Sequence, residues 1–273
     1  MIDYFSFFGG ATSDIDLEIS FVDYIRDFVM SNISLFEENI KPSYLLDSPY
    51  RELLIAIAKG DGKIYGAVKK ARISETLGEE LVIQLGNLGI IYLEESRESL
   101  LGSPNMQHKS YRAQSKIRFK IPFFRFWFGF IEPFRNEITN KNYDKVIDYL
   151  MAHYERLRSL IYEQLSNEML IEFFSENGKK IVYSSSYWDK ENEFDILALT
   201  ANNEIIIAEC KYKDRKVCRN ELGKLKFKAE QSNLNVSHWV LFSKDGFSKE
   251  LLHNKESSLT IFDIKDMQKW LLS

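Results

Sequence analysis

Three charged residues in the second half of the chain have the types and spacing needed for chemistry on a phosphate. Glu209 and Lys211 end the apolar run "IIIAECKYKD" at 205–214. Because side chains alternate along a strand, these two share one face, while Cys210 points to the other. Asp195 lies in "EFDILAL", an apolar segment joined to that run by "TANNE", which is a hairpin turn signal. The pattern predicts two strands of one hairpin that bring Asp195 beside Glu209.

Two neighbouring carboxylates repel each other, and burial increases the repulsion unless a cation lies between them. Magnesium is a hard cation that takes such oxygen ligands. A lysine beside the metal can neutralise developing charge and orient a water molecule for attack on phosphorus. The residues therefore predict a Mg²⁺ (or Mn²⁺) site with Lys211 at its rim.

The register of this hairpin decides whether the site can exist. If Asn202 and Asn203 formed a simple two-residue loop, Asp195 would face Cys210 across the ladder and point away from Glu209. A shared face requires a three-residue loop, a bulge, or an irregular strand start at Asp195. We predict one of these three.

These residues resemble a known motif. Asp195, followed after thirteen residues by Glu209-Cys210-Lys211, is similar to the PD-(D/E)XK nuclease motif, in which an Asp on one strand and Glu-x-Lys on the next bind metal and cut phosphodiesters. Phe194-Asp195 stands where that motif has Pro-Asp. More narrowly, "EFDILAL", "IIIAECKY" and "LGKLKFKAE" resemble the uncharacterised C-terminal domain of archaeal-type AAA ATPases, over roughly residues 45–273. In that family a winged helix and an "FRFWF"-like segment precede the nuclease-like unit, and the chain has "FRFWFGFIEPF".

The resemblance implies roles for particular residues. Helical Glu163 in "LIYEQL" is the best match to the family's glutamate ahead of the sheet, with Glu155 and Glu168 as competitors. The implied metal ligands are Asp195, Glu209 and the Cys210 carbonyl oxygen, the implied catalytic lysine is Lys211, and the implied phosphate-binding residues are Lys224, Lys226 and Lys228.

The elements that must position these residues form two kinds of domain. Residues 14–40 suit one or two amphipathic helices, and Pro42 and Pro49 bracket a linker. Three short helices then fit residues 50–88, with Gly60 as a stop and Ser74 as an N-cap, and the segments "IIYLEES" and "KIRFKIPF" can pair as a hairpin. Helix-helix-helix-hairpin is the order of a winged helix.

Residues 143–176 are expected to be largely helical, up to a stop at Gly178. Beyond them strands alternate with helices. The predicted strands are "KIVYSSSYW", "EFDILAL", "EIIIAECKY" and "HWVLFSK", and the predicted helices are "RNELGKLKFKAEQSN" and "DIKDMQKWLLS". The predicted fold class is α/β (α+β overall), with a helical segment at 1–49, a winged-helix domain with an aromatic connector at 50–140, and a restriction-endonuclease-like domain with a mixed sheet at 141–273.

A basic stretch covers residues 108–125 and contains no acid. It is a candidate for phosphate contacts, although alternating basic residues are equally normal on a solvated hairpin. Its cations are Lys109, Arg112, Lys116, Arg118, Lys120 and Arg125. The third helix, "SETLGEELVIQL", has three glutamates and no Lys or Arg, so sequence-specific reading of a groove by that helix is not expected. The aromatic run "FFRFWFGFIEPF" at 123–134 is expected to pack in a core between the domains, not to stack bases.

The composition of the chain limits which other classes of protein it could belong to. A formal net charge of −4 argues against a uniformly basic nucleic-acid surface, so any such surface must be local. Two cysteines and four histidines, unclustered, provide no zinc or disulfide framework. The "GG" at 9–10 leads into "ATSD", which is not a P-loop, and no run approaches the ~20 apolar residues that span a bilayer. A cytoplasmic protein without a membrane partner is expected.

Three functions remain open. The first is a metal-dependent DNA endonuclease whose winged helix docks on DNA or a protein. The second is a DNA-binding or regulatory protein without catalysis. The third is an adaptor for a separately encoded AAA-type ATPase. The expected partners are accordingly DNA, such an ATPase, and a second copy of the chain in a homodimer.

Overall fold

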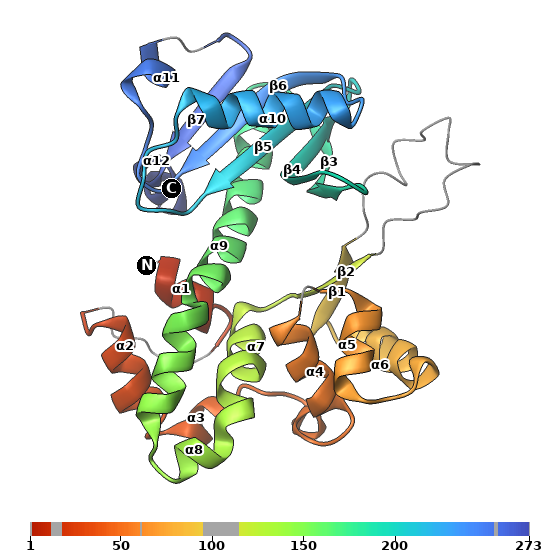
Figure 1. The fold of residues 1–273 in the computed structure, drawn as a ribbon, viewed down its shortest axis with the longest axis vertical. Coiled ribbons are helices and arrows are strands. Elements are labelled where there is room, and N and C mark those ends of the chain that lie inside the picture. The colour runs from red at the N-terminus through yellow and green to blue at the C-terminus, as the bar shows by residue number, and fades with distance from the viewer. Residues whose placement is uncertain (1, 12–17, 61, 95–114, 254–255, 273) are drawn as a thin grey trace. The chain divides into compact units, whose positions relative to one another are not determined.

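The computed structural model describes residues 2–11, 18–60, 62–94, 115–253 and 256–272. The described residues divide into two units, the first within residues 2–94 and 115–158 and the second within residues 159–272. Helices dominate the first unit and a mixed sheet forms the second (Figure 1), which confirms the predicted fold class. Among the described helices, none is both long enough and apolar enough to cross a membrane.

Short helices build most of the first unit. They are α1 (Ile2–Phe8), α2 (Phe21–Asp23), the π-helix η1 (Tyr24–Val29), α3 (Ile33–Glu37), the 3₁₀-helix η2 (Ser43–Leu46), α4 (Tyr50–Lys59), α5 (Ile64–Ala71), α6 (Glu75–Asn87), α7 (Pro122–Phe126), η5 (Trp127–Ile131), η6 (Glu132–Phe134) and α8 (Arg135–Thr139). The predicted linker after Pro42 contains η2, whose Leu45 is fully buried in the same core as α4.

The predicted three helices and hairpin are present in the first unit. Helix α4 ends at Gly60, and the Ser74 side chain caps α6 by accepting a hydrogen bond from the Leu77 amide at 3.3 Å. Strands β1 (Ile91–Glu94) and β2 (Lys116–Phe119) then pair antiparallel. The residues between these strands, with Lys109 and Arg112, lie outside the described part of the chain.

The aromatic run at 123–134 is helical and buried. Phe126, Trp127 and Phe128 are fully buried and belong to the core of the first unit. The prediction that this run packs in a core is confirmed. The rings pack on α1 and on one another within one unit, as in the Phe7–Phe126 pair with ring centroids 5.3 Å apart.

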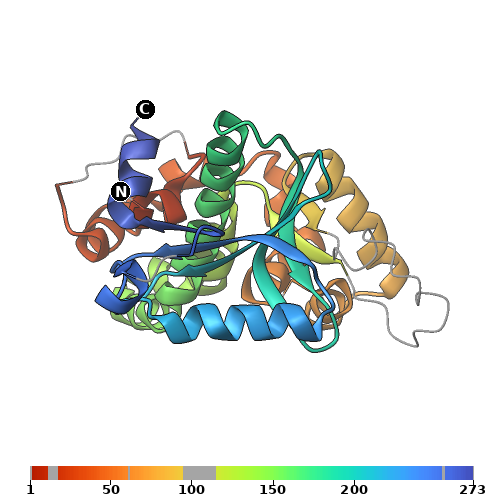
Figure 2. The same cartoon turned by 90° about the horizontal axis from the view of Figure 1, so that it is seen from above.

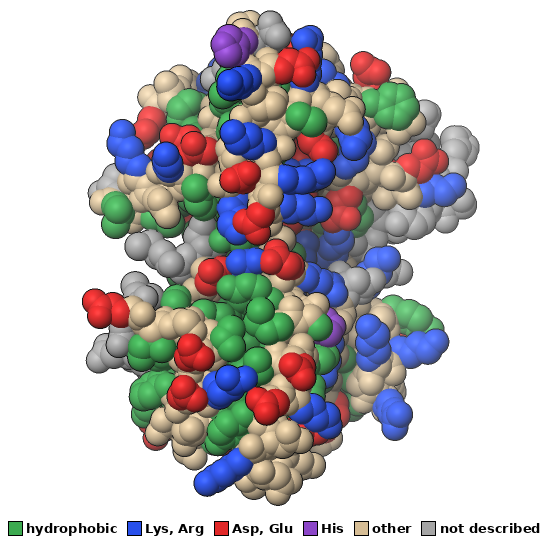
Figure 3. All heavy atoms as spheres, turned by 60° about the vertical axis from the view of Figure 1, so that its left-hand side comes forward, with side chains coloured by type: hydrophobic (Ala, Val, Ile, Leu, Met, Phe, Trp, Pro, Cys, Tyr) green, Lys and Arg blue, Asp and Glu red, His purple; other side chains and the backbone are tan. Residues whose placement is uncertain are grey.

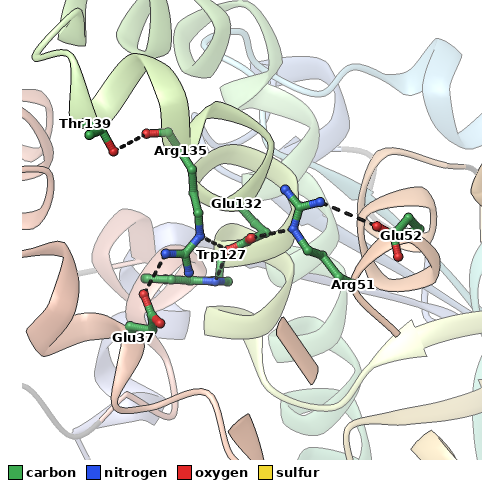
Figure 4. A network of polar contacts seen from close by, with 7 residues as sticks. All are labelled: Glu37, Arg51, Glu52, Trp127, Glu132, Arg135 and Thr139. Carbon is green, nitrogen blue, oxygen red and sulfur yellow. Dashed lines mark hydrogen bonds and ion pairs between the residues drawn. The ribbon is translucent and has the colours of Figure 1, made fainter. Parts of the chain in front are cut away.

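One buried carboxylate holds several elements of the first unit together (Figure 4). Glu132 is only 2% exposed and accepts hydrogen bonds from Arg51 Nε at 2.7 Å, Arg135 Nε at 2.6 Å and Trp127 Nε1 at 3.1 Å. Arg135 also pairs with Glu37 at 2.8 Å. The network therefore ties α3, α4 and η5 to the start of α8.

The second unit is built on a five-stranded sheet with the order β3-β4-β5-β6-β7. The first three strands are antiparallel, and β6 and β7 run parallel to β5. The elements are α9 (Tyr143–Glu176), shared with the first unit, then β3 (Ile181–Trp188), β4 (Glu193–Thr200), β5 (Ile205–Lys211), α10 (Arg219–Gln231), β6 (Val236–Ser243), α11 (Lys249–His253), β7 (Leu259–Asp263) and α12 (Ile264–Leu271).

Each face of this sheet is covered by a different helix (Figure 2). Leu222 and Leu225 of α10 pack with Ile207 of β5 in one core cluster. On the opposite face Tyr162 of α9 packs against Tyr212, with ring centroids 4.9 Å apart and the rings tilted at 49°. Side chains of β5 therefore alternate between the α10 face and the α9 face.

A three-residue loop joins β4 to β5, as the shared face requires. The ladder pairs Leu199 with Ile205, and the Thr200 amide donates to the Glu204 carbonyl at 3.0 Å, which leaves residues 201–203 as the loop. Asn203 has φ of 62°, in the left-handed region that asparagine tolerates better than most residues. The predicted departure from a two-residue loop is confirmed.

We expect substitutions at Asn203 to test this loop. Asn203→Gly should leave the free energy of unfolding unchanged or slightly higher, whereas Asn203→Val should lower it by about 1–2 kcal/mol, because a β-branched residue is strained at positive φ. Urea unfolding of both variants, with the exposed neighbour Asn202→Val as the control, measures the difference. An Asn203→Val variant as stable as the wild type would contradict this description of the loop.

Candidate metal and phosphate site

The hairpin register places Asp195 next to Glu209. Ile196 pairs with Ala208, the last pair of the β4–β5 ladder, so Asp195 and Glu209 are the next residues on the two strands. The β3–β4 register shifts at this point of β4, and the Asp195 side chain turns to the Cys210 amide, where the charges of Glu209 and of Lys228 on α10 both act on it. Lys211, two residues beyond Glu209, shares a face of β5 with it.

Local hydrogen bonds fix these side chains. Asp195 Oδ2 accepts a hydrogen bond from the Cys210 amide at 2.7 Å, and Lys211 forms an ion pair with Glu209. The side chains of Glu209 and Lys211 are 12% and 23% exposed, so water reaches the group from one side. No described residue donates a hydrogen bond to Asp195 Oδ1, which leaves that oxygen able to take a ligand.

The electrostatics of the carboxylate pair favour an added cation. Burial, and second to it the neighbouring Glu209 carboxylate, raise the pKa of Asp195 to about 7. The Cys210 amide, Lys211 and Lys228 oppose it. A divalent cation between the two carboxylates would remove their repulsion, because the charge of a metal reverses the local effect on pKa.

Burial alone would lower the pKa of Lys211, but the Glu209 carboxylate outweighs this and raises it, with smaller contributions from Asp195 and Glu221. Lys211 is therefore a stable cation beside the two carboxylates.

The Cys210 side chain lies on the other face of the sheet. It is buried against α9, and this burial raises the pKa of its thiol, with smaller contributions from the Asp195 and Glu163 charges. Cys210 pairs with Phe242 in the β5–β6 ladder. The metal role predicted for the Cys210 carbonyl stays a prediction.

The three candidate glutamates of α9 differ in their surroundings. Glu155 forms an ion pair with Arg158 inside the first unit, so its assignment to the site stays a prediction. Glu168 is exposed on the surface, and partial burial of its carboxyl raises its pKa. Glu163 is half-buried, and its charge acts on Cys210, so among the three glutamates it is the one that lies near the end of β5. Helix α9, however, covers the face of the sheet opposite Asp195. The assignment of Glu163 to the site stays a prediction.

The three lysines of α10 point in different directions. Lys228 donates to the Glu193 carbonyl at 3.3 Å, and its charge reaches Asp195, so it lies beside the carboxylate pair. Lys224 is 61% exposed and lies 4.0 Å from Glu221. Lys226 pairs with Glu256 at 2.6 Å and lies over the Trp239 ring, away from the carboxylates.

The basic residues of strand β2 in the first unit are mostly engaged. Lys116 is only 9% exposed, and Arg118 pairs with Glu94 at 2.8 Å, with side chains 15% and 10% exposed. Lys120 is exposed. On the face drawn in Figure 3, Lys and Arg side chains alternate with Asp and Glu without forming an unbroken basic field. On that face, a phosphate contact would therefore use a small local group of cations.

Sequence reasoning missed one acidic neighbour of this group. Glu221, in the first turn of α10, is 16% exposed, pairs with Arg215 at 3.3 Å, and contributes to the raised pKa of Lys211. Glu221 and Lys228 are seven residues apart and so lie on one flank of the helix, a signal that could have pointed to it. Within the described ranges, no group of three or more His, Cys, Asp or Glu side chains is arranged to hold a metal ion.

A protein family and one solved structure are similar to parts of this chain. Residues 127–225, which include Asp195, Glu209 and Lys211, match the DUF234 family, described as "Archaea bacterial proteins of unknown function". No curated protein matches the chain. A solved structure described as a repair endonuclease from Pyrococcus abyssi is similar at 16% identity and a TM-score of 0.25, over 36% of this chain and 46% of that one. This chain thus spans less than half of that protein, and at this TM-score the likeness carries no argument about function.

Proposed function

We propose that the second unit is a metal-dependent nuclease that hydrolyses phosphodiester bonds in DNA, with Asp195 and Glu209 binding Mg²⁺ or Mn²⁺ and Lys211 acting at the phosphate. The observation that carries the proposal is that two carboxylates and Lys211 meet at the end of the β4–β5 hairpin, where the Cys210 amide holds Asp195 and Lys211 pairs with Glu209. The similarity of Asp195 and Glu209-Cys210-Lys211 to the PD-(D/E)XK motif supports the same assignment.

The donor set fits a magnesium ion. Mg²⁺ is commonly held by one or two carboxylates and keeps several water ligands, so two protein carboxylates suffice without a third. Asp195 Oδ1 has no donor among the described residues, and the mutual repulsion of the pair would be relieved by a cation. When bound, the metal would lower the pKa of a coordinated water molecule and neutralise charge on the phosphate.

Residues of the chain itself would orient the metal ligand and bind the phosphates. Asp195 is held in place by the Cys210 amide, so its free oxygen has a defined direction. Lys211, released from Glu209 when that carboxylate turns to a metal, would bind a non-bridging phosphate oxygen as negative charge develops there. Lys228, beside the Asp195 strand, would hold the adjacent phosphate. In the first unit, three helices and a hairpin in winged-helix order would supply a docking surface for DNA or a partner protein.

The test combines melting with cleavage. Millimolar Mg²⁺ should raise the melting temperature of the wild type, because a ligand that binds only the folded state stabilises it. Supercoiled, linear duplex and single-stranded DNA should be incubated with Mg²⁺ or Mn²⁺, with EDTA as the control. Failure to cut any of them, with no metal-dependent rise in melting temperature, would exclude the nuclease.

We expect Lys211→Ala to separate the nuclease from a structural ion pair. In the nuclease, the variant should still bind Mg²⁺ and DNA, while cleavage falls about 100-fold or more, because stabilisation of the transition-state charge is lost. Cleavage rates and melting temperatures with and without Mg²⁺ measure both effects. Lys179→Ala, which removes a lysine from the exposed pair with Glu204, is the control. If Lys211→Ala mainly destabilises the fold and no metal response exists, Lys211 only neutralises Glu209.

A second candidate is a DNA-binding or regulatory protein that does not cleave. The observation that favours it is the Glu209–Lys211 ion pair, together with the lack of a third metal-binding side chain in the described ranges. Retardation of DNA that is unchanged by EDTA and not followed by cleavage would support it.

A further inference from the structure

Helix α10 carries an exposed aromatic ring. Phe227 is 59% exposed, more than any other phenylalanine of the described ranges, and no ring or cation of the described residues packs on it. The other phenylalanine near the carboxylates, Phe194, is fully buried and packs against Tyr187. A single exposed aromatic is common on protein surfaces, so its surroundings decide whether it has a role.

The first distinctive feature is the bare turn beside the ring. Gly223 lies one helical turn before Phe227, in the interior of a thirteen-residue helix, where glycine lowers helix stability relative to alanine. A Cβ placed on Gly223 would meet nothing within 4 Å, so no packing inside the protein requires a glycine here. The surface beside the Phe227 ring is therefore open.

The second feature is the row of charged residues on α10 between Phe227 and the candidate site. Leu222, Leu225 and Ala229 face the sheet, which turns Gly223 and Phe227 outward. Glu221 and Lys228 lie on the flank nearest the carboxylates, and Lys224, 61% exposed, lies between that flank and Phe227. Two cations thus connect the Asp195–Glu209 pair to the exposed ring.

From this arrangement we propose that Phe227 is a stacking platform for an unpaired nucleobase, so that the substrate is single-stranded DNA or DNA with an unpaired segment. The inference rests on the proposed function for the identity of the polymer. Phosphates following the bound one would contact Lys228 and Lys224, and the base would lie on the Phe227 ring over the open turn at Gly223. Basic grooves with exposed aromatic rings bind single strands, because every base offers a π-face.

An unpaired base fits better than a duplex or an apolar protein surface. A ring projecting from the crest of a helix can reach the face of a base only if that face is not stacked in a duplex. A protein partner would be expected to meet an apolar patch, but the exposed residues next to Phe227 are Lys224, Gly223 and Glu230.

The test measures binding without cleavage. Fluorescence anisotropy in EDTA would follow a labelled oligothymidine and a blunt duplex of the same length. Phe227→Leu should weaken binding of the single strand by about 5- to 100-fold, as expected for losing one stacked base, and should change duplex binding little. Phe227→Trp should retain or strengthen it.

Substitutions at Gly223 provide the matched pair. Gly223→Ala fills open space with one methyl group and should keep the affinity, whereas Gly223→Leu should cover the space beside the ring and weaken binding as Phe227→Leu does. Circular dichroism would confirm that all four variants are folded.

The inference would be overturned if Phe227→Leu bound the single strand with wild-type affinity, or if the Leu and Trp variants at 227 lost equal affinity. It would also be overturned if Phe227→Leu lost equal affinity for duplex and single strand, or if the wild type did not bind DNA. Loss of binding to a protein partner alone in Phe227→Leu would overturn it too. Cleavage tests the proposed function separately. A wild type that binds single strands through Phe227 but never cuts them contradicts the nuclease alone, and a nuclease whose binding ignores Phe227 contradicts the platform alone.

Discussion

Asp195→Asn should abolish metal-dependent cleavage and at the same time stabilise the metal-free protein. The substitution keeps the shape of the side chain, and the amide oxygen can still accept the hydrogen bond from the Cys210 amide. It removes one of two charged ligands, so metal affinity should fall enough to eliminate cleavage at millimolar Mg²⁺. The variant should also lose the rise in melting temperature that Mg²⁺ gives the wild type.

The stabilisation follows from the direction of the pKa shift. The pKa of Asp195 is raised to about 7 in the folded protein, first by burial and then by Glu209. Between the unfolded pKa near 4 and this value the folded state holds the proton more tightly, so the free energy of unfolding falls as pH rises through that window and the penalty is complete above it. A shift of three units corresponds to about 4 kcal/mol, which is the upper limit of the expected gain in stability.

The measurement is urea unfolding at pH 8 and near pH 4, each without metal. Asp195→Asn should be more stable than the wild type at pH 8 and nearly equal to it near pH 4. Asp189→Asn is the matched control, because hydrogen bonds from Ser232, Asn192 and Glu191 outweigh burial and lower the pKa of Asp189. That variant should be less stable at pH 8. A loss of stability in Asp195→Asn, or no pH dependence of its gain, would contradict the proposed repulsion.

The parts of the fold that local patterns determine were predictable. Helices α4, α5 and α6 follow from the spacing of apolar residues and from the Gly60 and Ser74 signals, and β4 and β5 follow from their apolar runs. The loop between them was predictable for a different reason. A regular two-residue turn would have separated Asp195 from Glu209, so the chemistry required a departure from it that the "TANNE" letters alone left open.

Other features depend on contacts between distant segments. Strand β7 and helix α11 were missed because β7 is a five-residue edge strand, whose parallel pairing with β6 gives no local signal. The ion pair of the β1–β2 hairpin was missed because the acidic partner of Arg118 lies outside the basic stretch. Glu94 on β1 pairs with Arg118 across the hairpin, and the basic stretch was judged without its partner strand. Glu221 was missed because its neighbour Lys211 is on another element.

The buried network around Glu132 gives the largest stability prediction. Glu132→Ala should lower the free energy of unfolding of the first unit by about 3–5 kcal/mol, because removing one member of a buried ion group leaves the others uncompensated. Arg51 and Arg135 would each lose the partner of their Nε, and the Trp127 indole nitrogen would lose its only acceptor shown in Figure 4. The cavity left by the side chain adds to the cost.

Glu132→Gln separates charge from shape in this network. The amide keeps the volume and can accept one hydrogen bond, but its NH₂ group would face guanidinium donors, so we expect a loss of about 1–3 kcal/mol, between the wild type and the Ala variant. Calorimetry of the full chain, followed by near-ultraviolet circular dichroism for the packing of Trp127, measures both variants. Glu137→Gln, which disrupts only the surface pair with Lys145, is the control and should leave the melting temperature almost unchanged. If Glu132→Ala were as stable as Glu137→Gln, the network would not hold these helices together, and the hydrophobic core around Trp127 would account for their packing by itself.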